Sequence, residues 1–255
     1  MENIILQNIY DFYGAIGKEM STSFYQSESI SWLNSGNGNW PNMIYNVDVD
    51  ESEIDPFIKQ QISAIKAKKA PPFWLVNHCD KNKILQEKLK LNGFREIFRW
   101  TGMGLNTDKI QKLTLPKNYQ LKIINQEDEL KYWLQVVNIA LMTGNQIGKS
   151  VFEKLYLQPN FKLYLVTNNE QPVATGLAFF NKNYCGIYMI ATLEENRKKG
   201  IGTAITQQCI NDAIKKGIKN IVLQASPKGE SIYQKMGFKN YSEFSIYWLL
   251  GKEFK

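Results

Sequence analysis

Three basic residues and two glycines fall within six consecutive positions, in the stretch RKKGIG at 197–202. The apolar run CGIYMIAT at 185–192 predicts a strand before this stretch, and apolar periodicity predicts a helix at 203–216 after it. Glycine lets a ligand approach the backbone closely, and the first turn of a helix leaves N–H groups unpaired. Arginine and lysine add positive charge beside those groups. The pattern therefore predicts a phosphate site at a helix start.

The spacing of the glycines argues against two common nucleotide-binding motifs. The sequence contains no GxxxxGK[ST] here, so the stretch is not a Walker A loop. It also lacks GxGxxG, which disfavours NAD binding. The plain alternative is a basic surface loop that ends in an ordinary glycine turn.

The composition is that of a globular protein with a basic surface. The 255 residues are 44% hydrophobic and 13% aromatic, and the formal net charge is +7. Such a charge favours anionic partners, although a lysine-rich surface alone would also produce it. No RNP, zinc-finger or helix-turn-helix signature accompanies the charge, so we expect no nucleic-acid partner.

Neither a disulfide framework nor a metal site is expected. The three cysteines, Cys79, Cys185 and Cys209, are far apart and form no CxxC pair. The single histidine, His78, lies among turn-like residues and is expected to be structural or exposed. The start, MENIILQNIYDF, does not read as a signal peptide, and no apolar run approaches the roughly 20 residues that span a bilayer. We expect a cytoplasmic protein without a membrane partner.

The first part of the chain alternates helices and strands. Residues 2 to about 26 have a mostly helical pattern, and WPNMIYNVDV at 40–49 alternates like a strand. Asp55 as N-cap and Pro56 predict the start of a helix that runs to about Lys69. A buried strand at 73–76, a helix at 81–91 and an aromatic strand at 94–105 follow. The polar residues 106–118 are the best candidate linker.

The second part repeats this alternation. Helices are predicted at 127–142 and from Ser226 to Gly237, in addition to that at 203–216. Further strands are predicted at 119–124, 161–168, 172–180, 220–225 and 242–250. Hairpin strands mixed with crossover helices indicate an α/β or α+β domain.

Two segments of the chain align with each other without a gap. LKLNGFREIFRWTGMGL at 89–105 and YQKMGFKNYSEFSIYWL at 233–249 share a helix-ending Gly-Phe pair and then an aromatic strand. A strand and a short helix precede each segment. We expect a duplicated fold, although a helix, a glycine and a strand also recur by chance. The first copy has no equivalent of RKKGIG.

At this point the sequence resembles the GNAT superfamily of acetyl-CoA-dependent N-acetyltransferases. Arg197-x-x-Gly200-x-Gly202 matches the family signature R/Q-x-x-G-x-G/A. IYMIATLEENRKKGIGTA at 187–204 looks like the family's fourth strand, pyrophosphate loop and third helix, and SIYQKMGF at 231–238 like its distal motif. The resemblance covers about 118–250 and implies a mixed central sheet flanked by helices. It suggests a degenerate GNAT-like domain at 1–112 and a GNAT domain at 118–255.

The resemblance implies a binding site for acetyl-CoA as co-substrate. The strand residues Met189, Ile190 and Ala191 would pair with its pantetheine arm in the manner of an added strand. Ser226 occupies a place where many members carry a cofactor-contacting asparagine, and it is also a plain helix N-cap. The loop would hold the pyrophosphate through Arg197, Lys198, Lys199, Gly200, Ile201, Gly202 and Thr203.

The resemblance also assigns catalytic groups. Tyr233 aligns with the general acid that protonates the leaving thiolate, and a backbone N–H of 189–191 would stabilise the oxyanion. Tyr233 is alternatively a core tyrosine. Its counterpart in the first copy is Leu89, so we expect one active site per chain. Some members carry a glutamate base where this sequence has Tyr184, and Glu194 and Glu195 are left unassigned. Deprotonation would then proceed through water, or the amine would arrive partly neutral.

The expected activity is acetyl transfer by direct attack of a primary amine, from a small molecule or a peptide, in a monomer or homodimer. Trp32, Trp40 and the loop at 36–39 are candidates for the acceptor pocket, and equally for surface and core. The alternative is a non-catalytic acyl-CoA-binding regulatory module, suggested by the missing strand glutamate and the degenerate half.

Overall fold

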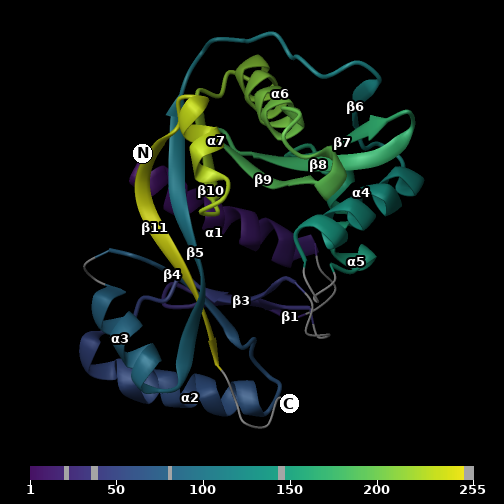
Figure 1. The fold of residues 1–255 in the computed structure, drawn as a ribbon. Coiled ribbons are helices and arrows are strands. Elements are labelled where there is room, and N and C mark those ends of the chain that lie inside the picture. The colour runs from purple at the N-terminus through teal and green to yellow at the C-terminus, as the bar shows by residue number, and fades with distance from the viewer. Residues whose placement is uncertain (20–22, 36–39, 80–81, 143–146, 250–255) are drawn as a thin grey trace.

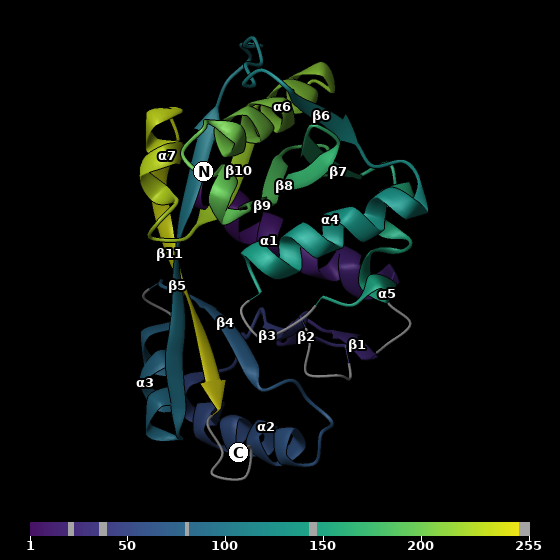
Figure 2. The same cartoon turned by 45° about the vertical axis from the view of Figure 1, so that its right-hand side comes forward.

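A computed structural model of the protein describes residues 1–19, 23–35, 40–79, 82–142 and 147–249. In these residues eleven strands form one mixed sheet, with helices on both of its faces (Figures 1 and 2). The strand order is β1-β2-β3-β4-β11-β5-β10-β9-β8-β7-β6. The mixed α/β architecture predicted from the sequence is confirmed.

The first half of the chain contains three helices and five strands among its described residues. They are α1 (Glu2–Glu19), β1 (Ser23–Gln26), β2 (Ser31–Asn34), β3 (Asn42–Tyr45), α2 (Ile54–Lys66), β4 (Phe73–Asn77), α3 (Lys83–Leu91) and β5 (Phe94–Asn106). A short 3-10 turn, η1 (Glu51–Glu53), leads into α2.

The second half begins after residues 107–118, which contain no helix or strand. Its elements are β6 (Tyr119–Ile123), α4 (Glu127–Ala140), α5 (Lys149–Phe152), β7 (Phe161–Asn168), β8 (Gln171–Phe180), β9 (Cys185–Thr192), α6 (Ile201–Lys215), β10 (Asn220–Ala225), α7 (Glu230–Lys235) and β11 (Lys239–Leu249). The 3-10 turns η3 (Leu155–Leu157) and η4 (Glu194–Asn196) lie between them.

The strand order is symmetric about the β5–β11 pair. Outward from this pair, β4, β3, β2 and β1 on one side correspond to β10, β9, β8 and β7 on the other. The inner pairs of each half, β3 with β4 and β9 with β10, are both parallel and are joined by a helix, α2 or α6. The two last strands are exchanged, because β11 lies between β4 and β5 while β5 lies between β11 and β10.

The register of β5 with β11 has the same symmetry at single-residue level. In the ungapped alignment of 89–105 with 233–249, Trp100 and Phe244 are counterparts, and they pair with each other in the sheet. Leu249 pairs with Phe94, and Trp248 with Arg95, while Arg95's counterpart Lys239 pairs with Gly104, the counterpart of Trp248. The two register shifts also fall at counterpart positions, around Tyr241 and Ile97. The pairing therefore supports the duplication predicted from sequence.

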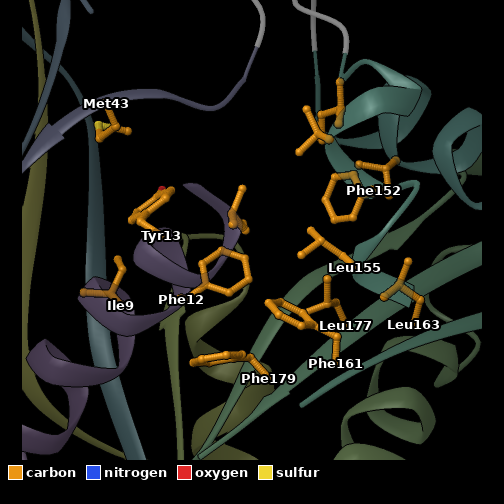
Figure 3. Close-up of a cluster of buried hydrophobic side chains, with 14 of the residues drawn as sticks. Ile9, Phe12, Tyr13, Met43, Phe152, Leu155, Phe161, Leu163, Leu177 and Phe179 are labelled. Carbon is orange, nitrogen blue, oxygen red and sulfur yellow. The ribbon is translucent and has the colours of Figure 1, made fainter. Parts of the chain in front are cut away.

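The halves are joined by more than the central strands. Helix α1 contacts β5, β9, β10 and β11, so the first helix of the chain packs on the sheet of the second half. Figure 3 shows Ile9, Phe12 and Tyr13 of α1 facing Phe161, Leu177 and Phe179 across one buried cluster. A second cluster lies beneath α6 on the opposite face, and a third lies between α2, α3 and the sheet. The boundary between domains 1–112 and 118–255 stays a prediction.

Four details of the predicted elements were wrong. The helix predicted at 2–26 ends at Glu19, because β1 begins at Ser23 and pairs with β2. Helix α2 begins at Ile54, which leaves Asp55 inside its first turn, in contact with Lys88, rather than as N-cap. The helix predicted at 127–142 ends at Ala140, so Leu141 lies beyond α4, where it is 42% exposed. Helix α7 begins at Glu230, after a turn that follows Ser226.

Candidate functional site

The parallel pair β9 and β10 separates part way along its length. The strands pair from Cys185 with Ile221 to Ile187 with Leu223, and among the described residues the pairing goes no further. Met189 then has φ 51°, which is rare for a residue with a side chain, and the pairing of β9 with β8 shifts register at the same place. The β10-facing edge of residues 189–191 is therefore left without a strand partner.

The loop after β9 presents a row of unpaired N–H groups. The backbone N–H groups of Lys198, Lys199, Gly200, Ile201, Gly202 and Thr203 donate to no acceptor in the part of the chain that the structure describes. Gly200 is the N-cap of α6 at φ 77°, a left-handed conformation that glycine adopts without strain. A substituent at its Cα would meet nothing within 4 Å. The geometry is that of an anion site at a helix N-terminus.

Two basic side chains of the loop stabilise the loop itself. Arg197 Nε donates to the carbonyl of Thr192 at 3.0 Å. Lys199 Nζ donates to the carbonyl of Glu195 at 3.0 Å and to the hydroxyl of Tyr119 at 3.2 Å. Both side chains remain exposed, as do Lys198 and Thr203, so their charge still lies at the mouth of the loop.

Two supporting residues of the loop were not singled out from the sequence. Asn196 is buried, and its Oδ1 accepts a 2.7 Å hydrogen bond from Tyr119, the first residue of β6. Tyr119 therefore links the edge strand β6 to the loop, and its hydroxyl also accepts a hydrogen bond from Lys199 Nζ. An aromatic residue at a strand start gave no signal of this role, because its partner lies far along the sequence.

Tyr233 lies on α7, on the same face of the sheet as α6. Its ring packs against the cluster that contains Ile205 and Cys209 of α6, and lies edge-on to Phe238 with centroids 5.9 Å apart. Burial, with a smaller contribution from Cys209, raises the pKa of Tyr233 to about 12. Among the described residues no partner receives or offers a hydrogen bond at its hydroxyl. The phenol is therefore protonated at neutral pH and free to donate.

Ser226 is exposed at the end of β10. Its carbonyl accepts hydrogen bonds from the N–H groups of Gly229 and Glu230, at 2.9 and 3.1 Å, which closes the turn before α7. The prediction that it caps the helix was wrong, because Gly229 is the N-cap. Ser226 lies three residues beyond Leu223, the last residue of β10 that pairs with β9.

The opposite face of β9 is covered by α1. The ring of Tyr188 stacks on Phe12 with centroids 3.7 Å apart and planes 7° apart, and its hydroxyl donates to the side chain of Asn8. Gly186 makes this approach sterically accessible, because a Cβ there would lie 2.4 Å from Asn8 Oδ1. Nothing in the sequence assigned α1 to this strand.

The position where some GNAT members carry a strand glutamate holds Tyr184. Its hydroxyl donates to Asp11 of α1, and burial and this carboxylate raise its pKa above the ordinary range. Neither β9 nor β10 contains a carboxylate. Glu194 and Glu195 are exposed in η4.

The acceptor-pocket candidates separate in space. Trp40 stacks on Phe152 and lies near Phe12, with centroids at 6.1 and 6.4 Å, so it belongs to the cluster beneath α1. Trp32 instead stacks on Tyr25 at the far edge of the sheet. The loop at 36–39 lies outside the described residues.

No group of three histidine, cysteine, aspartate or glutamate side chains among the described residues is arranged to hold a metal ion. In the same part of the chain, no helix has the length and apolar character to cross a membrane.

Comparisons with known proteins agree with this geometry. Residues 137–245 match the family model described as acetyltransferase (GNAT) domain. No curated protein matches the sequence. A GCN5-related N-acetyltransferase from Kribbella flavida has a similar structure, with a TM-score of 0.74 and 14% identity over 98% of this chain and 97% of that chain.

Two further solved structures share the arrangement. A GCN5-related N-acetyltransferase from Sphaerobacter thermophilus has a TM-score of 0.65 and 12% identity over 86% of this chain and 75% of that chain. A tandem GNAT protein from the clavulanic acid biosynthesis pathway has a TM-score of 0.57 and 11% identity over 80% and 74%. Such identities show the fold alone. The chain therefore has the fold of GNAT proteins, and its residues 137–245 match the model of their acetyltransferase domain.

Proposed function

We propose that this protein transfers an acetyl group from acetyl-CoA to a primary amine, at one active site in its second half. The observation that carries the proposal is the row of unpaired N–H groups from Lys198 to Thr203 at the start of α6. Six donors beside three basic residues fit a diphosphate, and the separated strand edge at 189–191 fits an extended, amide-containing arm. These features match coenzyme A better than a compact phosphate ester.

The residues of the site divide the work of acyl transfer. The loop and Ser226 hold the cofactor, and Met189, Ile190 and Ala191 offer backbone groups to its arm. When bound, acetyl-CoA supplies the activated acetyl group. A backbone N–H of this strand is the donor to the oxygen that gains negative charge. Tyr233 holds the proton that the departing sulfur takes up, which its raised pKa keeps in place at neutral pH.

The acceptor amine must lose a proton for attack. With no carboxylate in β9 or β10, the proton leaves through water, or the amine arrives neutral. An α-amine has a pKa near 8 and a lysine side chain near 10.4, so the neutral form is much more abundant for an α-amine. This favours α-amines of small molecules or peptides over lysine side chains.

Substitution at Gly202 tests the cofactor site. A Cβ at Gly202 would meet only Ile190 Cγ2 at 3.5 Å, an ordinary contact, so the backbone position itself accepts a side chain. Gly202→Trp places an indole across the N–H groups, and we expect its affinity for coenzyme A, measured by calorimetry, to fall by about 100-fold or more. Gly148→Trp, also at a helix start with room for a Cβ, is the matched control. Equal affinity in the two variants would remove the assignment.

A non-catalytic acyl-CoA-binding module is the second candidate function, favoured by the absence of a carboxylate in β9 and β10. The two candidates differ in thiol release. Incubation with acetyl-CoA and a panel of amines should release free coenzyme A above the hydrolysis background. Tight binding of acetyl-CoA with no release for any amine would favour the module.

A further inference from the structure

Three buried polar groups without partners lie where α1 covers β9, β10 and β11. Among the described residues, Asn8 Nδ2, Gln224 Nε2 and Ser242 Oγ are buried and take part in no hydrogen bond. An unsatisfied buried donor destabilises the folded state by about 1–3 kcal/mol, so a cluster of three requires an explanation.

The sheet register places two of these groups in one row. Gln224 of β10 pairs with Gly102 of β5, which pairs in turn with Ser242 of β11. Residues directly opposite one another in a sheet point to the same face. A Cβ at Gly102 would lie 2.2 Å from Ser242 Oγ and 3.0 Å from Ile5 of α1, so this row faces α1. The missing side chain at Gly102 leaves the space that Ser242 Oγ occupies.

The third group belongs to α1 and lies over the neighbouring strand, β9. Asn8 of α1 lies over Gly186 of β9. Its Oδ1 accepts a hydrogen bond from the hydroxyl of Tyr188, whereas its Nδ2 has no partner among the described residues. Gly186 pairs with Val222, two residues before Gln224. Val222 belongs to the buried cluster beneath α1, and strand alternation puts Gln224 on the same face.

Gln224 also marks the point where the strands separate. Leu223 is the last residue of β10 that pairs with β9, so Gln224 is the first residue beyond the pairing, level with Tyr188 and one step from Met189. The strand edge that we propose to hold the thioester therefore begins beside this amide. Gln224 faces α1, whereas the loop at 197–203 and Tyr233 lie with α6 on the other face. On the α1 face, Gln224 is therefore the side chain level with the start of the strand edge at 189–191.

We infer that Gln224, with Asn8 and Ser242, forms a binding site for a carbonyl or carboxylate oxygen of the acceptor, close to its reacting amine. The two amides supply N–H donors, and the serine hydroxyl completes the row. The acceptor class is an α-amino amide, an α-amino acid or a peptide N-terminus, in which a carbonyl carbon is bonded to the carbon that carries the amine. This inference rests on the proposed function and specifies its acceptor. Gln224 is a specificity residue in this scheme and takes no part in proton transfer.

The test compares L-phenylalaninamide with 2-phenylethylamine, which lacks the carboxamide on the carbon that carries the amine. Acetylation of each is followed by release of coenzyme A, in wild type and in Gln224→Leu. The amines differ in pKa, so the wild-type ratio of kcat/KM alone does not decide. We expect Gln224→Leu to lower the ratio of phenylalaninamide to phenylethylamine by about tenfold, with the KM for acetyl-CoA unchanged. Gln120→Leu, an exposed glutamine on β6, is the matched control.

Thermal unfolding separates a recognition role from a structural one. Leucine removes the buried, unpaired Nε2 of Gln224, so the inference predicts that Gln224→Leu unfolds at the same temperature as wild type or higher. Lower stability together with an unchanged substrate ratio would overturn the inference, as would an unchanged ratio alone. Failure of acetyl-CoA to bind wild type in calorimetry would instead overturn the proposed function. Binding without acetylation of either amine would overturn the acceptor class.

Discussion

At the scale of single residues, the proposed function gives the phenol of Tyr233 and the N–H groups of the loop different tasks. Burial among apolar side chains keeps the phenol protonated, which suits a proton donor. The loop N–H groups are unpaired because Gly200 turns the chain into α6 in a left-handed conformation. Binding and proton delivery are therefore separable by mutation.

Tyr233→Phe is the residue-scale test of proton delivery. It removes only the hydroxyl, which has no partner among the described residues, so we expect the free energy of unfolding to change by less than about 0.5 kcal/mol. We expect kcat to fall by about 10²-fold, with the KM for acetyl-CoA within about twofold. Steady-state kinetics measures both. A kcat equal to that of wild type would make Tyr233 a packing residue only.

His78 provides a second residue-scale test, of stability against pH. Its Nε2 lies 2.6 Å from Ser245 Oγ and its Nδ1 lies 3.3 Å from Glu243, and Ser245 in turn donates to Glu96. Burial, then the charge of Arg99, lowers the pKa of His78, against the opposing effect of Glu243. The unfolded chain therefore binds a proton more readily than the folded one below about pH 6.5, and stability falls as the pH drops.

The measurement is urea unfolding at about pH 7.5 and pH 5.5, for wild type and His78→Gln. We expect the wild type to lose more stability than the variant on acidification, since the variant lacks the titrating ring. An equal loss in both proteins would contradict the assigned shift of the His78 pKa.

At the scale of elements, α1 positions the strand that lines the proposed site. The start of the chain packs closely on the sheet where the strands carry glycine. Met1 lies against Gly104 and Ile5 against Gly102, both in β5, and Asn8 lies against Gly186 in β9. Phe12 then stacks on Tyr188, one residue before the left-handed Met189. Helix α1 and strand β9 therefore form one packed unit, although most of the chain separates them.

Phe12→Ala tests this packing. Phe12 is 1% exposed and contacts Tyr188, Phe161 and Phe179. A cavity of this size destabilises a core by about 3 kcal/mol or more. We expect that loss in the free energy of unfolding, measured with denaturant, together with a reduced kcat. Phe57→Ala, in the partly buried periphery of the α2 cluster, should destabilise the protein without changing kcat. A kcat of Phe12→Ala equal to that of wild type would show that the packing of α1 on β9 does not affect the site.

Sequence patterns located most elements but not their partners. Periodicity identified β5 and β11 as aromatic strands, and the alignment of 89–105 with 233–249 identified them as counterparts. Their exchange between the halves was beyond sequence reasoning, because alternation fixes which residues share a face and says nothing of the neighbouring strand. The predicted helix wrongly included the residues of the short strand β1 for the same reason, since the pairing of β1 with β2 decides its conformation.

The candidate site divides along a similar line. The resemblance assigned the loop and Tyr233 because both lie in local motifs. Tyr119, Asn8 and Gln224 lie in no motif, and their relevance comes from contacts between distant segments, such as Tyr119 with Asn196 and Gln224 with Gly102. Single-sequence reasoning has no signal for such contacts.

At the scale of the whole molecule, the exchanged strands make each half depend on the other. Without β11, strands β4 and β5 lose their common neighbour, and without β5, strands β10 and β11 lose theirs. Separated from the first half, the second half would also lack α1, which covers one face of its strands. The exchange therefore predicts that the half without a phosphate loop is necessary for the fold of the other.

Expression of 1–112 and 118–255 as separate chains tests this dependence. We expect neither fragment alone to give a cooperative thermal transition, because each exposes an apolar sheet face and an unpaired strand. Co-expression should restore a complex that elutes at the size of the whole chain and unfolds cooperatively. A second half that folds alone and binds coenzyme A with full affinity would show the halves to be independent.

The proposed function depends on the backbone of residues 198–203 binding the diphosphate of coenzyme A. A crystal structure of the intact protein with coenzyme A tests it most directly. We expect diphosphate oxygens within hydrogen-bond distance, about 3 Å, of several of these N–H groups, with the pantetheine arm along residues 189–191. A diphosphate bound elsewhere on the molecule, with the loop N–H groups left unpaired, would contradict it.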